Sequence, residues 1–86
     1  MAKQVKTFYY VDKHDNHKST FAAIDDDKEI RSLEVIDKIG AALQEFGFGR
    51  KDICNSVAYE LVYHGSAELD CTMGSYAFGY EVAFMI

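Results

Sequence analysis

The chain lacks proline and tryptophan, and it has only two cysteines among its 86 residues. With no proline, no low-complexity stretch and no internal repeat, nothing in the sequence marks a linker. Because a chain this short has too few residues for two cores, we expect one domain over residues 1–86. Cys54 and Cys71 are too few for a disulfide framework and lack zinc-type spacing, which argues against a disulfide-rich secreted scaffold.

Long hydrophobic runs are also missing. The longest uncharged run, residues 71–80, is far shorter than a membrane span and contains two glycines. Residues 1–6 include lysines, but no apolar stretch of signal-peptide length follows them. We therefore expect a cytoplasmic protein that does not contact membranes.

Positive charge is the minority: nine basic residues face fourteen acidic ones, for a net charge of −5. Proteins that bind DNA, RNA or anionic lipids normally have the opposite balance. The composition therefore argues against direct nucleic-acid binding and favours a larger protein partner with a basic surface, although mild acidity also serves solubility.

A folded protein is nevertheless expected, because 49% of the residues are hydrophobic and 14% are aromatic. Residues 5–24 predict a β-hairpin, since two stretches rich in β-branched and aromatic residues flank a polar break. A two-residue turn at 15–16 would place Phe8 opposite Ala23. Both faces of the first strand are apolar, which favours a central place in the sheet.

Residues 26–46 predict one long helix. Asp26 is positioned to cap it, and Glu29 would complete a capping box. Gly47 or Gly49 would end it. One apolar stripe recurs at helical spacing and consists of Ile30, Leu33, Ile36, Ile39, Gly40, Leu43 and Phe46.

Residues 56–86 predict a three-stranded meander, because apolar residues alternate along them. A three-residue loop at 64–66 and a two-residue turn at 74–75 keep the apolar sets on one face. The predicted fold class is therefore α+β, in the order ββαβββ, with an antiparallel sheet and one long helix packed on one face. A second helix is the open alternative, because helical spacing also fits Ile53, Cys54, Val57, Ala58, Leu61 and Val62.

The meander would carry carboxylates on its outer face. In the predicted register Glu60 lies opposite Asp70 and Glu68 lies opposite Glu81, each pair costing about 0.2–1 kcal/mol. Such a cost suggests that the negative face has a use. Of a partner-binding surface, a divalent-cation site and an acid–base pair, we favour the partner-binding surface, because a flat sheet presents its carboxylates in parallel. A merely solvated face is the alternative.

Exposed tyrosines beside these carboxylates would serve as contact anchors, and Tyr63 is the candidate adjoining them. A weaker cluster, His14, Asp15 and His17, offers metal-ligand side chains at the hairpin tip, but its spacing matches no strong zinc pattern. A polar turn explains it as well. No nucleophile context accompanies His64, so we expect neither a catalytic residue nor a cofactor.

The sequence thus predicts a non-enzymatic binding or inhibitor protein that presents an acidic, tyrosine-dotted sheet face to a basic, nucleic-acid-binding site on a larger protein. By analogy of class alone, phages and mobile elements make such proteins against host defences. The alternative is a homodimer or assembly subunit that pairs through a sheet edge or the apolar C-terminal strand. A small metal-binding protein is the third hypothesis.

Overall fold

A computed structural model describes residues 3–25, 33–72 and 74–85 of the chain. Within these ranges the chain forms two strands, two helices and two further strands. The elements are β1 (Lys3–Asp12), β2 (Lys18–Asp25), α1 (Leu33–Glu45), α2 (Lys51–His64), β3 (Ser66–Cys71) and β4 (Gly74–Met85).

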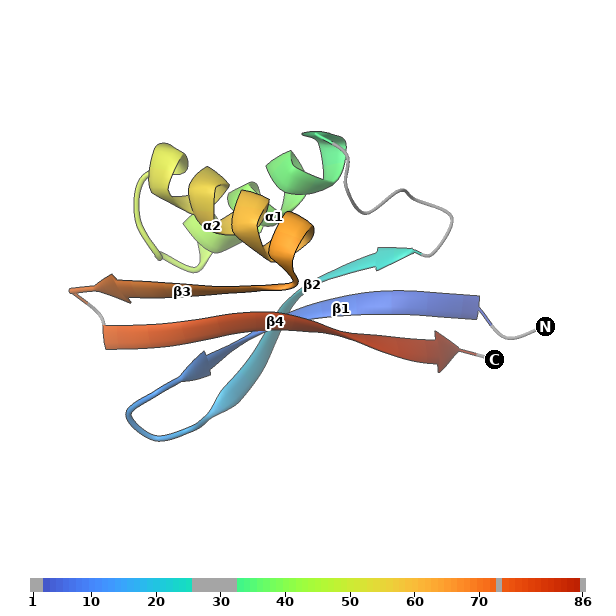
Figure 1. Ribbon diagram of the computed structural model, residues 1–86, viewed down its shortest axis with the longest axis horizontal. Coiled ribbons are helices and arrows are strands. Elements are labelled where there is room, and N and C mark those ends of the chain that lie inside the picture. Colours follow the sequence, from blue (N-terminus) through green and yellow to red (C-terminus); the bar gives the residue numbers. More distant parts are fainter. Residues whose placement is uncertain (1–2, 26–32, 73, 86) are drawn as a thin grey trace.

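The strands form one antiparallel sheet in the order β2-β1-β4-β3, and both helices lie against the same face of it (Figure 1). The α+β class, the antiparallel sheet and the central position of the first strand are confirmed. The order ββαβββ with one long helix is wrong, because a second helix stands where the first strand of the meander was expected.

The β1–β2 hairpin has a wider turn than predicted. Its loop occupies residues 13–17, and the N–H groups of His14 and His17 bond to the side chains of Asp12 and Asp15. These aspartates build the loop from local side-chain turns instead of a two-residue turn. The register that this turn sets would place Phe8 opposite Phe21, but a bulge between Phe8 and Tyr9 shifts it by one residue. Phe8 therefore pairs with Ala22, and the predicted pairing with Ala23 is wrong by one residue.

Helix α1 ends close to the predicted position. After Glu45 the chain turns at Gly47, whose φ of 85° is a left-handed conformation that suits glycine. The N–H of Phe48 bonds to the carbonyl of Leu43 at 3.1 Å and satisfies the helix end. The predicted cap at Asp26 and the capping-box residue Glu29 lie outside the described residues.

Helix α2 replaces the strand predicted from residue 56 to Tyr63. The alternating residues Val57, Tyr59, Leu61 and Tyr63 also form two pairs spaced four apart, and one pair is buried while the other is exposed. Spacing of four places each pair on one side of a helix, so the pattern fits either structure. Gly65, with φ 81°, donates its N–H to the Leu61 carbonyl and ends the helix.

The β3–β4 hairpin is confirmed, but its two strands pair in a different register from the predicted one. Cys71 pairs with Gly74 and Leu69 with Tyr76, whereas the predicted turn at 74–75 would have paired Cys71 with Phe78. The shift of four residues is even, so the apolar side chains keep their face although every partner changes.

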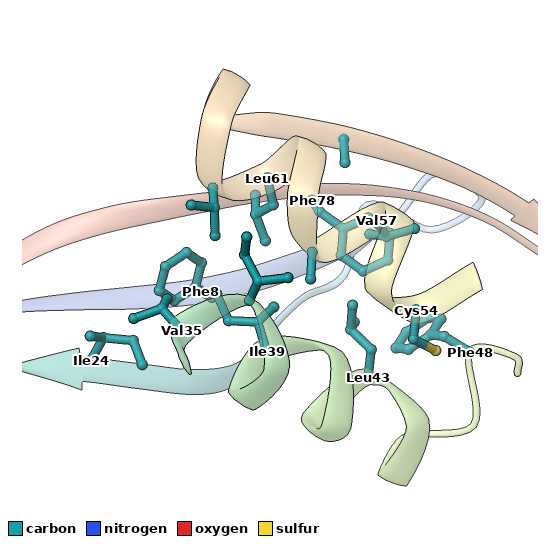
Figure 2. Packing of buried hydrophobic residues seen from close by; sticks show 14 of the residues in the cluster. Phe8, Ile24, Val35, Ile39, Leu43, Phe48, Cys54, Val57, Leu61 and Phe78 are labelled. Carbon is teal, nitrogen blue, oxygen red and sulfur yellow. The ribbon is translucent and has the colours of Figure 1, made fainter. Parts of the chain in front are cut away.

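The core lies between the helices and the sheet (Figure 2). Phe8 from β1, Ile39 and Leu43 from α1, and Leu61 from α2 are fully buried in it. At one end an aromatic cluster forms where Phe48 packs 4.9 Å from both Tyr10 and Tyr76, and 5.4 Å from Phe78, between ring centroids. Among the described elements, none covers the opposite face of the sheet.

Candidate protein-binding surface

Two tyrosines stand together on the exposed side of α2. Tyr59 and Tyr63 are one helical turn apart, and their rings stack with centroids 4.5 Å apart and a 30° interplanar angle. Tyr59 is 52% exposed and Tyr63 is 39% exposed. Exposed tyrosines of this kind provide large contact areas for little loss of side-chain freedom.

The surface beside this pair is apolar and negatively charged. A shallow hollow of about 480 Å³ lies between α1 and α2, and Leu33 at its rim is 78% exposed. Asp37 and Glu60 add carboxylates to the same hollow. We call this surface the helix face and define it as Leu33, Asp37, Tyr59, Glu60 and Tyr63.

A second hollow of about 330 Å³, the α2–β3 cleft, adjoins the helix face through Glu60. Its polar rim brings Glu60 together with Asp52 and Glu68, while Val57 and Leu69 supply apolar lining. Of the three carboxylates, only Glu60 has no ion pair among the described residues. The fold therefore brings Glu60 and Glu68, which the sequence analysis predicted as partner-binding residues, together with Asp52, which it did not predict.

The other two carboxylates of the cleft, Asp52 and Glu68, form exposed ion pairs. Asp52 is 3.6 Å from the Arg50 guanidinium, and Glu68 is 2.9 Å from the Lys13 ammonium. Exposed pairs of this kind are screened by solvent and exchange readily with other charges. A positively charged partner can therefore compete with Arg50 and Lys13 for these carboxylates.

The predicted carboxylate pairs across the sheet do not form. Glu60 and Tyr63 lie on α2, whereas Asp70 and Glu81 lie on the face of the sheet that the helices leave open, and Glu68 lies on the edge strand β3, where it also lines the α2–β3 cleft. Their strand neighbours are uncharged: Glu68 pairs with Ala77, Asp70 with Ser75 and Glu81 with Thr7. The prediction of opposed carboxylates is thus wrong, and no repulsion of that kind marks this face.

Lysines also reduce the negative charge of the open sheet face. Lys13 pairs with Glu68, and Lys18 pairs with Glu81. The Lys18 ammonium also lies 4.2 Å from the centre of the Tyr9 ring. Because these pairs are as exposed as those of the cleft, the exposed Tyr59–Tyr63 pair is what makes the helix face the stronger candidate for a basic partner.

The histidines of the hairpin tip are exposed, as a polar turn requires. Asp12 and Asp15 accept backbone hydrogen bonds of 2.8 and 2.9 Å, and the His17 ring nitrogen Nδ1 is 3.3 Å from the Ser19 hydroxyl. Across the described ranges, no three histidine, cysteine or carboxylate side chains gather as a metal site would need. In the structure, His14, Asp15 and His17 form a polar turn that Asp12 and Asp15 hold by backbone hydrogen bonds.

Buried ionisable groups lie away from the helix face. Burial raises the pKa of the Cys54 thiol above its ordinary value of 9.0, and Asp52 raises it further. The thiol lies 3.6 Å from the Gly49 carbonyl oxygen. Burial likewise raises the pKa of Tyr76 above 10.0, with a further contribution from Asp12. Both groups stay neutral at pH 7 and act as packing residues.

Sequence reasoning missed Leu33, Asp37, Asp52 and Tyr59 as surface residues. Two of them, Asp52 and Tyr59, lie in the segment 52–63, for which a second helix was the alternative. Leu33 lies in the predicted stripe of α1, yet its side chain is exposed. Only the placement of α2 beside α1 made these residues neighbours.

The helices within the described ranges are all too short or too polar to cross a membrane. Comparisons with protein-family models, curated proteins and solved structures gave no match. A proposed function therefore depends on the geometry and the charge of the helix face.

Proposed function

We propose that this chain is a non-enzymatic binding protein that docks its helix face onto a basic surface of a larger protein. The observation that carries the proposal is the stacked, exposed Tyr59–Tyr63 pair beside Glu60. Aromatic anchors of this type supply most of the energy of many interfaces, while surrounding charges guide the approach.

The proposal moves the binding surface from the sheet to the helices. Tyr63 and Glu60 keep their proposed roles, and Glu68 contributes from the rim of the α2–β3 cleft. Asp70 and Glu81 lie on the open sheet face and are not part of the proposed contact. The cleft fits an extended basic side chain, because apolar walls can hold its stem and carboxylates its head.

The partner is proposed to be a protein whose basic groove normally binds nucleic acid. Such grooves attract polyanions, and the carboxylates of Asp37, Asp52 and Glu60, on a chain of net charge −5, would be attracted in the same way. Occupying the groove would exclude the nucleic acid. This makes inhibition the proposed consequence of binding.

The test compares two double charge reversals that change the net charge equally. Asp52→Lys with Glu60→Lys alters the helix side, whereas Asp70→Lys with Glu81→Lys alters the open sheet face. The unaltered protein is used to capture partners from an extract of the cells that produce it, and the affinity of each variant for the captured protein is then measured by calorimetry at low and high salt. We expect the helix-side variant to lose binding and the sheet variant to retain it.

A second variant, Tyr59→Ala with Tyr63→Ala, tests the anchors without changing charge. We expect it to weaken binding by at least about 2 kcal/mol, the usual loss at dominant interface residues. Because both tyrosines are on the surface, circular dichroism should show an intact fold. Equal losses for the helix-side and sheet-side charge variants, or unchanged affinity after removal of both tyrosines, would refute the proposed surface.

A further inference from the structure

Strand β4 has one edge that is only half occupied. On its inner edge β1 pairs along the strand from Asp12–Tyr76 to Lys3–Met85. On its outer edge β3 pairs only with Gly74–Gly79, since it begins at Ser66 opposite Gly79. From residue 80 to residue 85, no described strand pairs with the outer edge, and Figure 1 shows β4 running past the start of β3.

The other edges of the sheet are protected against pairing. A bulge near Phe8 and Tyr9 distorts the β1–β2 ladder, and Lys18 adds a charge to β2. Strand β3 is six residues long, carries Glu68 and Asp70, and lies against α2. Short length, charge and bulges are the usual ways in which proteins block sheet edges.

The free part of β4 has few of these features. Its sequence from residue 80 to 85 is Tyr-Glu-Val-Ala-Phe-Met, with one charged residue and no proline. That residue, Glu81, is already paired with Lys18. The β1–β4 register runs without a bulge, and Val82 is 44% exposed. An apolar, regular edge of this length is a ready template for pairing with another strand.

We propose that a second copy of this chain supplies that strand, so that two β4 segments pair antiparallel across a two-fold axis. An antiparallel pair of identical segments satisfies both free edges at once, as an isologous dimer requires. The charge distribution permits the approach, because Glu81 is neutralised and Lys6 lies beside Val82, whereas the carboxylates of α1, α2 and β3 lie elsewhere. A continuous eight-stranded sheet results from two copies of the four-stranded one.

The register follows from the length of the free edge. Pairing Ala83 with Ala83 of the second copy fills the edge from residue 81 to 85 and stops short of the position that Ser66 occupies. It sets Glu81 opposite position 85 of the second copy and separates the two Glu81 positions by about 13 Å along the strands. Registers centred on Val82 or Glu81 bring the two carboxylates closer and run into β3.

This register also fixes the relative orientation of the helices. Residues directly opposite each other in a ladder point to the same face, and equal residues pair at the centre. Both helix pairs then lie on one side of the joined sheet. The dimer would thus present two helix faces in the same direction, which would increase avidity for a partner with two sites.

The sharpest test is a disulfide at the two-fold axis. In a Cys71→Ser background, Ala83→Cys would bring two thiols opposite each other with Cα atoms about 4.5–5.5 Å apart, within the range for a disulfide. We expect mild oxidation to give a covalent dimer on a non-reducing gel. Thr20→Cys, an equally exposed site on β2, is the matched control and should stay monomeric.

Sedimentation equilibrium of the unaltered protein provides the second readout. We expect a reversible dimer that Ala83→Lys dissociates, because two ammonium groups would meet at the axis, and that Ala23→Lys on β2 leaves intact. A monomer at concentrations up to about 1 mM would overturn the proposal. Equal cross-linking of the Thr20→Cys control, or a dimer unaffected by Ala83→Lys, would overturn it as well. Binding of the free edge only to a strand from another protein would also overturn it.

Discussion

At the scale of the residue, burial raises the pKa of two side chains, Cys54 and Tyr76. Cys71 packs partly buried against the core, whereas Cys54 is fully buried within α2. Both thiols are free. The sequence could identify small apolar positions, but the depth of each depended on whether residues 51–64 formed a strand or a helix.

The raised pKa values of Cys54 and Tyr76 predict a loss of stability at high pH. Folding favours the neutral thiol and phenol, so their contribution is complete below their ordinary values of 9.0 and 10.0 and is lost as pH rises above them. We expect the free energy of unfolding, measured with urea, to fall as the pH rises above 9 for Cys54 and above 10 for Tyr76. Cys54→Ala should be less stable overall and should show a shallower fall. The same slope in both proteins would contradict the assignment to Cys54.

At the scale of the element, the packing of α1 on α2 depends on Gly40. Gly40 belongs to the apolar stripe that was expected to pack on the sheet, but the neighbour that approaches it is Asn55 of α2. A Cβ atom at Gly40 would meet the Asn55 side chain and lie 3.6 Å from its Cα. The middle of the predicted stripe, from Ile36 to Leu43, is thus confirmed, whereas its partner was not predicted, because periodicity defines an apolar side and not what covers it.

This close approach gives a mutational prediction. Gly40→Val should lower the free energy of unfolding by about 1–3 kcal/mol, the usual cost of overpacking, because the added methyl groups have no room beside Asn55. Ala41→Val is the matched control on the exposed side of α1 and should cost only a few tenths of a kcal/mol in helix propensity. Thermal or urea unfolding measures both. Equal losses would show that the two helices separate easily.

At the scale of the whole molecule, the sheet order places β1 and β4 at the centre, and both contribute buried aromatic residues to the core. A central first strand was predictable from its two apolar faces. The partnership of β1 with β4 was not, since the two strands are separated by most of the chain and local patterns contain no information about such distant pairing.

The arrangement predicts an order of amide hydrogen exchange. The amides of Phe8 and Phe78, in the central strands under the helices, should exchange only through global unfolding, whereas those of β2 should exchange faster through local opening. Gly40→Val should speed the exchange of the Phe8 and Phe78 amides by the factor that corresponds to its loss in free energy of unfolding. It should leave the exchange of the β2 amides nearly unchanged. Exchange in β2 as slow as in β1 would contradict this order.

The sequence by itself determined the local pieces of this protein: a first hairpin, a helix ending near Gly47, an acidic surface and an apolar C-terminal strand. These depend on side-chain periodicity, glycine and charge, which act over a few residues. The tertiary structure decided whether residues 51–64 coil, because the spacing of Val57, Tyr59, Leu61 and Tyr63 suits either period and only burial against α1 and the sheet selects one. That choice moved Glu60 and Tyr63 from the sheet to the helix face.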